Sequence, residues 1–173
     1  MRVVAGEARG RRLEAPVGDD TRPTSDRVRE AVFNSLSSMD VLDGAKVLDL
    51  FAGSGALGIE ALSRYAVHCT FVERARPALD AIRLNLEHTQ CSDRADIVIT
   101  DAAAFVDQGK ASGYDLILAD PPYAFTEWAR LLRGIPAGIV VAESDRAVAA
   151  PDGWEAVREK RYGKTWVTFL KRM

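Results

Sequence analysis

The sequence is poor in the residues that build metal centres and disulfide frameworks. It contains two cysteines and two histidines among 173 residues. Cys69 and Cys91 do not follow a spacing typical of metal ligation or thiol exchange, and His68 and His88 are not spaced as a metal site either. We therefore expect both cysteines to be reduced and structural, and we expect no metal centre.

Long apolar runs are also missing. The first apolar residues, Val3, Val4 and Ala5, are too few for the hydrophobic region of a signal peptide, and no stretch approaches the ~20 residues that span a membrane. The sequence therefore predicts a cytoplasmic protein. Its length of 173 residues, with 47% hydrophobic and 28% charged residues, is enough for one globular domain with its own core. Nothing in it indicates an obligate dimer, so we expect a monomer.

The chain lacks the strongly positive charge of many nucleic-acid-binding proteins, since its net charge is −2. The charge is unevenly distributed, however. Residues 1–30 hold seven arginines and six acids, residues 31–154 hold ten basic and seventeen acidic residues, and residues 155–173 hold six basic and two acidic residues. Ordinary solvated surface and a phosphate-binding face formed by the two ends both explain this pattern. The candidate phosphate contacts are Arg9, Arg11, Arg12, Arg22, Arg27 and Lys164, with Lys160 and Arg161 nearby.

Strand and helix patterns alternate from Lys46 onward. Short apolar, often β-branched runs predict strands at 46–50, 68–73, 95–100, 114–119 and 138–143. Helical spacing predicts helices at 56–64, 77–89, 102–108 and 126–134, after a first helix that runs from a cap at Thr24 or Ser25 to about Ser37. Two last strands, 154–161 and 165–171, form a predicted hairpin. The pattern indicates an α/β fold, a doubly wound, mostly parallel, seven-stranded Rossmann-like sheet with a C-terminal antiparallel hairpin.

The N-terminal region departs from this alternation. Residues 2–5 and 11–15 have the composition of short strands, and the glycine-bounded segment between them predicts a small hairpin rich in arginine. An irregular linker follows. We therefore expect a β-hairpin extension over residues 1–20 and a single catalytic domain over residues 21–173.

A glycine-punctuated loop follows the first predicted parallel strand. Gly53, Gly55 and Gly58 give the G-x-G-x-x-G spacing of dinucleotide-binding loops, in which backbone and helix N–H groups approach the ligand. Asp49 stands at the carboxyl end of the strand, where it would repel a pyrophosphate and attract a cation. Two ligands stay open at this point: a nicotinamide dinucleotide, and S-adenosylmethionine, which carries an ammonium and a sulfonium but no phosphate.

Acidic residues follow three successive strands. Besides Asp49 they are Glu73, which lies eighteen residues beyond Gly55, and Asp101. A carboxylate in the position of Glu73 can accept hydrogen bonds from both ribose hydroxyls, and Asp101 can accept one from an adenine amino group. The three acids together predict an adenosine pocket at the carboxyl edge of the sheet.

The fourth strand ends in Asp120, Pro121, Pro122 and Tyr123. Two consecutive prolines remove two N–H donors and fix φ, which leaves a stiff backbone whose carbonyl groups face the cleft. A carboxylate, a carbonyl and an aromatic ring on such a loop can grip a planar amine, with the ring stacked on the base and the acceptors orienting the N–H groups. A base held in a duplex would have to be extruded or unpaired to reach it.

Over essentially its whole length the chain resembles the class I S-adenosylmethionine-dependent methyltransferases, and more narrowly the bacterial RsmD-type 16S ribosomal RNA guanine-N2 methyltransferases. The stretches that carry the resemblance are Met1-Arg2-Val3-Val4-Ala5-Gly6, Arg22-Pro23-Thr24 with Asp26-Arg27-Val28-Arg29-Glu30, Asp49 with Phe51-Ala52-Gly53-Ser54-Gly55-Ala56-Leu57-Gly58, and Asp120-Pro121-Pro122-Tyr123. The last is shared by many amino-methyltransferases. The family often has Phe at the position of Tyr123, which keeps the stacking ring.

The resemblance implies S-adenosylmethionine as cofactor, the small ribosomal subunit or its assembly intermediates as partner, and an N-terminal hairpin used for RNA. The implied cofactor-binding residues are Asp49, Phe51, Gly53, Gly55, Glu73, Arg74, Asp101 and Ala102, and the implied catalytic residues are Asp120, Pro121, Pro122 and Tyr123. Guanine offers two adjacent donors that one carboxylate can accept, which agrees with the resemblance. The alternatives are methylation of DNA adenine N6 or of a protein glutamine, a nicotinamide-dependent oxidoreductase, and a non-catalytic RNA-binding assembly factor.

Overall fold

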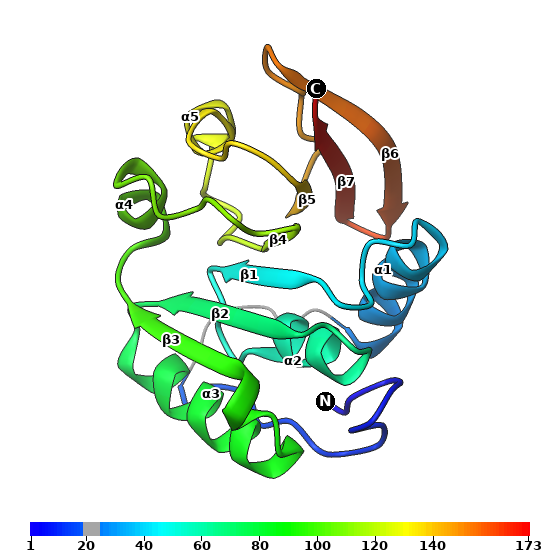
Figure 1. Cartoon of the computed structure of the whole chain (residues 1–173), viewed down its shortest axis with the longest axis vertical. Helices are drawn as coiled ribbons and strands as arrows, with labels where there is room; N and C mark the ends of the chain where they lie inside the picture. The colour runs from blue at the N-terminus through cyan, green and yellow to red at the C-terminus, as the bar shows by residue number, and fades with distance from the viewer. Residues whose placement is uncertain (19–24) are drawn as a thin grey trace.

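The computed structural model describes residues 1–18 and 25–173, in which helices flank a seven-stranded sheet (Figure 1). The strands are β1 (Lys46–Leu50), β2 (His68–Glu73), β3 (Ala95–Ile99), β4 (Leu116–Ala119), β5 (Ile139–Ser144), β6 (Trp154–Tyr162) and β7 (Thr165–Arg172). The helices are α1 (Asp26–Ser38), α2 (Ala56–Ser63), α3 (Arg76–Thr89), α4 (Ala102–Asp107) and α5 (Trp128–Arg133), with a 3₁₀ turn η1 (Ser92–Arg94).

The strands lie in the order β3-β2-β1-β4-β5-β7-β6. The first five are parallel to one another, and β7 runs antiparallel to both β5 and β6. The chain winds outward from β1 in one direction to β3 and in the other to β5, so loops that follow β1 and β4 leave the sheet at its topological switch point. The doubly wound sheet and the C-terminal hairpin expected from the sequence are confirmed.

Alternation along the central strands divides the core into two layers. Val47 packs in one cluster with apolar residues of α1, α2 and α3, while Leu48 and Leu50 pack in a second cluster with α4 and α5. A strand buried on both faces needs apolar side chains at successive positions, which is why the predicted strands are continuous hydrophobic runs. Asp49 has the same parity as Val47 and therefore faces the layer that contains α2.

Local signals in the sequence set where the helices begin. The Ser25 hydroxyl accepts a hydrogen bond from the Val28 N–H at 3.2 Å and caps α1. Ser25 is one of the two residues expected in this role, and Thr24 lies outside the described residues. Pro77 falls in the first turn of α3, where its missing N–H breaks no helical hydrogen bond.

The N-terminal segment forms part of the predicted hairpin. An isolated antiparallel bridge joins Arg2 to Arg12, and beside it the Val3 N–H donates to the Arg11 carbonyl at 3.0 Å and the Leu13 N–H to the Met1 carbonyl at 2.8 Å. The pairing does not continue over residues 4–5, because their N–H groups bond to α2 instead. The N–H groups of Val4 and Ala5 donate to the Glu60 carboxylate, at 2.9 and 3.1 Å. The expected boundary between residues 20 and 21 lies outside the described residues.

The remaining expectations about composition concern the cysteines, metals and membrane spans. Both cysteines are buried free thiols, as expected. In residues 1–18 and 25–173, no three His, Cys, Asp or Glu side chains are grouped so that they could hold a metal ion. The same residues include no helix with the length and apolar character needed to cross a membrane.

Candidate active site

The loop after β1 turns through left-handed backbone conformations. Gly53 has a φ of +58° and Gly55 one of +81°, and Gly55 is also the N-cap of α2. Phe51 adopts a φ of +58°, which is uncommon for a residue with a side chain. Its ring packs edge-on against Phe125 with 5.3 Å between centroids, and Phe125 packs in the same way on Trp128. These aromatic contacts join the loop after β1 to the segment that follows Tyr123.

Asp49 is buried beneath this loop, with only 1% of its surface exposed. Its Oδ2 accepts a hydrogen bond from the Gly58 N–H at 3.0 Å. Burial raises the pKa of Asp49 well above its usual range; the Gly58 hydrogen bond lowers it, and the nearby negative charges of Asp120 and Glu73 raise it further. Carboxylates from three strand ends therefore converge on one place, which favours a cationic ligand there and disfavours a pyrophosphate.

The third glycine of the motif has a packing role. A Cβ atom at Gly58 would lie 2.3 Å from Cε1 of Phe71 and 2.7 Å from Sγ of Cys69. Helix α2 therefore packs on β2 only because residue 58 has no side chain. At Gly53, by contrast, an added Cβ would meet no atom within 4 Å. Of the two positions, Gly53 is the one with space beside it for a ligand.

Glu73 links two loops of the site. Its Oε1 accepts a hydrogen bond from the Gly53 N–H at 2.9 Å, and its Oε2 accepts from the N–H groups of Arg74 and Ala75 at 2.7 and 3.0 Å. One carboxylate thus fixes the glycine loop after β1 relative to the turn after β2. This explains physically why an acid stands at the end of β2.

Asp101 begins α4 and meets a neighbour from the turn after β2. Its Oδ1 accepts a hydrogen bond from the Ala104 N–H at 3.1 Å, as a helix cap does, and its Oδ2 lies 3.3 Å from Nη1 of Arg74. Arg74 is largely exposed, so this ion pair contributes little to stability. Ala102 is buried at the first position of α4. The structure thus brings Arg74, Asp101 and Ala102 together beside Glu73.

The segment after β4 presents the four residues singled out in the sequence. Asp120 is half-buried, Pro121 is buried, and Pro122 and Tyr123 are exposed, Tyr123 by 43%. The Pro122 carbonyl accepts a hydrogen bond from the Phe125 N–H at 2.9 Å, which closes a tight turn. Ala119, the last residue of β4, pairs with Leu50, the last residue of β1, so this turn and the glycine loop leave the sheet from neighbouring strand ends.

The described basic residues proposed for phosphate contacts come from three separate parts of the chain. Arg9, Arg11 and Arg12 are exposed on the N-terminal segment, where Nη1 of Arg11 donates to the His88 carbonyl at 2.8 Å. Arg27 is exposed on α1, Lys164 is exposed in the turn between β6 and β7, and Arg22 lies outside the described residues.

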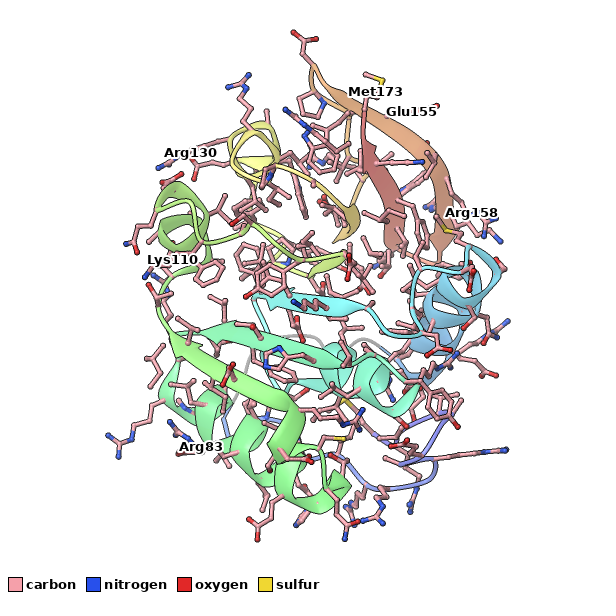
Figure 2. All side chains as sticks on the ribbon, in the orientation of Figure 1. Arg83, Lys110, Arg130, Glu155, Arg158 and Met173 are labelled. Atoms are coloured by element: carbon pink, nitrogen blue, oxygen red, sulfur yellow. The ribbon has the colours of Figure 1, made fainter. Side chains whose placement is uncertain are left out.

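Other arginines also reach outward from distant parts of the surface. Figure 2 shows Arg83 on α3 and Arg130 on α5 pointing away from the core. Basic side chains are therefore spread over several elements, and exposure alone does not identify an RNA-binding face.

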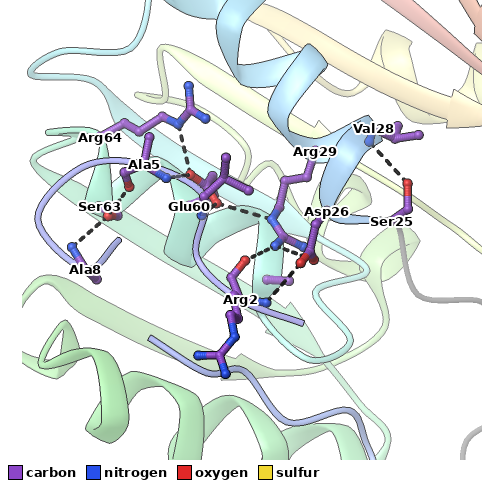
Figure 3. A network of polar contacts seen from close by, with 12 residues as sticks. Arg2, Ala5, Ala8, Ser25, Asp26, Val28, Arg29, Glu60, Ser63 and Arg64 are labelled. Atoms are coloured by element: carbon purple, nitrogen blue, oxygen red, sulfur yellow. Dashed lines mark hydrogen bonds and ion pairs between the residues drawn. The ribbon is translucent and has the colours of Figure 1, made fainter. Parts of the chain in front are cut away.

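A buried charge network holds the N-terminal segment against α1 and α2 (Figure 3). Glu60 and Arg29 are fully buried, and Oε1 of Glu60 lies 3.2 Å from Nε of Arg29, while its Oε2 lies 2.9 Å from Nε of Arg64. Nη2 of Arg29 donates to the Arg2 carbonyl and, at 2.9 Å, to Asp26.

This network was not foreseen in the sequence. One signal for it was available, because Glu60 is the only charged residue in the otherwise apolar stretch of α2. A charge at a position that helical spacing buries needs partners, and these come from α1 and from residues 2–5.

Comparisons with known proteins agree with this architecture. A family model described as "Conserved hypothetical protein 95" matches residues 1–171. The YlbH protein of Bacillus subtilis (strain 168) is 39% identical over 184 residues, which cover 99% of each chain. The "Ribosomal RNA small subunit methyltransferase D" of Haemophilus influenzae is 32% identical over 174 residues, covering 94% of this chain and 89% of that one. The solved structure of yhhF from Escherichia coli has a TM-score of 0.85 and 34% identity, with 99% and 97% of the chains covered.

Proposed function

The chain belongs to the ribosomal RNA small subunit methyltransferase D family, and from that premise we propose that it methylates the exocyclic N2 of a guanine in 16S rRNA with S-adenosylmethionine. The observation that carries the proposal is the convergence of Asp49, Glu73 and Asp120 at the switch point of the sheet, beside a glycine loop. An assembly factor without catalytic activity would have no need of Asp120 on its stiff loop.

The acidic residues of the site fit S-adenosylmethionine better than a nicotinamide dinucleotide. Three negative side chains near one another are stabilised by a ligand with an ammonium and a sulfonium, and they repel a pyrophosphate. We propose that Asp49, Phe51, Gly53 and Gly55 hold the methionine part. The ribose and adenine would lie against Glu73, Arg74, Asp101 and Ala102.

Two of these acids already have partners, which limits how they bind. A carboxylate has about four acceptor positions, and described N–H donors use three of those of Glu73. Binding both ribose hydroxyls at Glu73 therefore requires shared acceptors or a small shift of the turn at Arg74. As the cap of α4, Asp101 accepts from the Ala104 N–H, and its other oxygen pairs with Arg74, so an adenine amino group would compete with the exposed Arg74.

S-adenosylmethionine supplies a methyl group that its sulfonium has already activated. The chain has to hold the amine in line with that methyl group and exclude competing orientations. Asp120 would accept hydrogen bonds from guanine N1–H and N2–H and favour loss of the N2 proton. The ring of Tyr123 would stack on the extruded base and offset part of the cost of unstacking it. Pro121 and Pro122 keep the turn stiff, so this geometry is present before the base arrives.

We further propose that the substrate is 16S rRNA in the small ribosomal subunit or in its assembly intermediates, and that the protein acts as a cytoplasmic monomer. The exposed arginines Arg9, Arg11, Arg12 and Arg27, together with Arg22 and Lys164, would contact RNA phosphates, and this contribution should weaken as salt is raised.

Transfer of tritium from S-adenosylmethionine to small subunits that lack this methylation tests the proposal. Wild type should label the rRNA, while Asp120→Asn should lose about 100-fold or more in kcat and still bind S-adenosylhomocysteine. Asp93→Asn, which changes an exposed acid in η1, is the matched control and should match wild type. No label with folded wild type contradicts the function, and normal turnover by Asp120→Asn contradicts the role of Asp120.

A further inference from the structure

One buried amide on α3 bonds both to the N-terminal segment and to the glycine loop. Asn85 has no exposed surface. Its Oδ1 accepts a hydrogen bond from the Glu14 N–H at 2.8 Å, and its Nδ2 donates to the Glu14 carbonyl at 2.9 Å. The same Nδ2 donates to the Ser54 carbonyl, also at 2.9 Å. Ser54 stands between Gly53 and Gly55, and Glu14 follows the arginines of the N-terminal segment by two residues.

The orientation of this amide is fixed by its partners. The Ser54 and Glu14 carbonyl groups can only accept hydrogen bonds, so they require the NH₂ end, while the Glu14 N–H can only donate and requires the oxygen. A flipped amide would lose all three bonds. Because the site is buried, water cannot replace them, and any displacement of Glu14 or Ser54 strains the shared group.

We propose that Asn85 is a positioning residue that couples RNA binding at the N-terminal segment to cofactor binding at the glycine loop. This inference rests on the proposed function, since it takes residues 9–14 as an RNA contact and residues 53–55 as a cofactor contact. A ligand that orders Ser54 restrains Asn85, and Asn85 in turn restrains the backbone of Glu14. Because coupling between binding sites is reciprocal, rRNA must tighten cofactor binding by the same factor by which the cofactor tightens rRNA binding.

The other anchors of the N-terminal segment end elsewhere. The Ser63 hydroxyl accepts from the Ala8 N–H at 2.9 Å and donates to the Ala5 carbonyl at 2.6 Å. Ser63 is the last residue of α2, at the opposite end of that helix from Gly55. A loss of the Ser63 bonds loosens the segment without touching the glycine loop, whereas a loss of the Asn85 amide separates the two.

The test measures the dissociation constant of S-adenosylhomocysteine with and without 16S rRNA in small subunits. For wild type we expect at least about a 5-fold tighter constant with the subunit bound, and for Asn85→Leu a ratio near one. Thr89→Val is the matched control, because the Thr89 hydroxyl lies one turn further along α3 and bonds only to carbonyls of its own helix. Thr89→Val and Ser63→Ala should both keep the wild-type ratio.

A second measurement uses only the wild-type protein, so it does not depend on whether a variant folds. In wild type without RNA, S-adenosylhomocysteine alone should slow the hydrogen exchange of the Glu14 amide and leave that of the Ala8 amide unchanged. The coupling is overturned if both amides are protected equally or if neither is protected. It is also overturned if the ratio of dissociation constants is one in wild type, or if folded Asn85→Leu keeps the wild-type ratio. These outcomes differ from a failure of the proposed function, in which wild type neither binds S-adenosylhomocysteine nor labels rRNA.

Discussion

Removal of the Glu60 carboxylate should destabilise the protein strongly. Glu60→Leu keeps the volume and the helix but leaves Arg29 and Arg64 buried without their shared acid. It also removes the acceptor of the Val4 and Ala5 N–H groups. The change therefore acts on α1, on α2 and on the N-terminal segment at once.

The expected cost follows from these lost contacts. Breaking a buried ion pair by removing one partner costs about 3–5 kcal/mol. Without Glu60, Arg29 keeps its ion pair with Asp26, whereas Arg64 loses the acid that its Nε contacts. Two part-buried N–H groups without acceptors add roughly 1 kcal/mol each at most, and the terms overlap because they share one carboxylate. A loss of about 4–5 kcal/mol is a large part of the ~5–15 kcal/mol that stabilises a domain, and should lower Tm by roughly 10–20 °C.

Urea unfolding of Glu60→Leu, Arg29→Met and the double variant measures this directly. Because the double variant removes Glu60 and Arg29 together and leaves Arg64 as the one arginine that has lost Glu60, it should be less destabilised than the sum of the two single variants, by more than about 1 kcal/mol. Glu155→Leu, an exposed acid of β6, is the control and should change stability by about 0.5 kcal/mol or less. Strict additivity, or a Glu60→Leu cost below about 1 kcal/mol, would refute the reasoning.

Two further predictions concern α2 and the acid beneath it. Gly58→Ala places a Cβ against Phe71 and Cys69 and should lower the free energy of unfolding in urea by about 1–3 kcal/mol. Cys69→Ala should restore part of this loss, because it removes one of the two contacts. An unchanged urea midpoint in Gly58→Ala would show that α2 can shift freely. Burial raises the pKa of Asp49 in the folded protein above its unfolded-state pKa of about 3.9. The stability that protonated Asp49 contributes is therefore complete below the unfolded-state pKa and is lost as the pH rises through the folded-state pKa. Asp49→Asn should therefore gain in Tm relative to wild type as the pH rises above about 4, yet bind S-adenosylmethionine more weakly. If the Tm advantage of Asp49→Asn over wild type grows on acidification instead, the direction of the Asp49 pKa shift is contradicted.

The sequence was most informative where burial imposes a simple pattern. Strands such as β4 lie between two helical layers, so their apolar runs are visible without any knowledge of their neighbours. Asp49 and Glu73 could be placed at strand ends because parallel strands all end at one edge of the sheet. The structure then added what Glu73 does there, which is to hold the Gly53 N–H.

Contacts between distant segments could not be read in the same way. Val4 and Ala5 look like a strand because their local composition favours one, and only the position of Glu60 on a packed α2 shows why they bond to a helix. Asn85 is an ordinary polar residue of α3 until Glu14 and Ser54 are found on either side of it. Such roles depend on tertiary placement, to which periodicity is insensitive.

The most direct test of the central claim is the identity of the modified nucleoside. Small subunits that lack the methyl group are treated with wild-type protein and S-adenosylmethionine, and their 16S rRNA is digested and analysed by mass spectrometry. The account predicts N2-methylguanosine at one position, formed by wild type and absent with Asp120→Asn. Methylation at another atom or nucleoside, or only in DNA or protein, would contradict it.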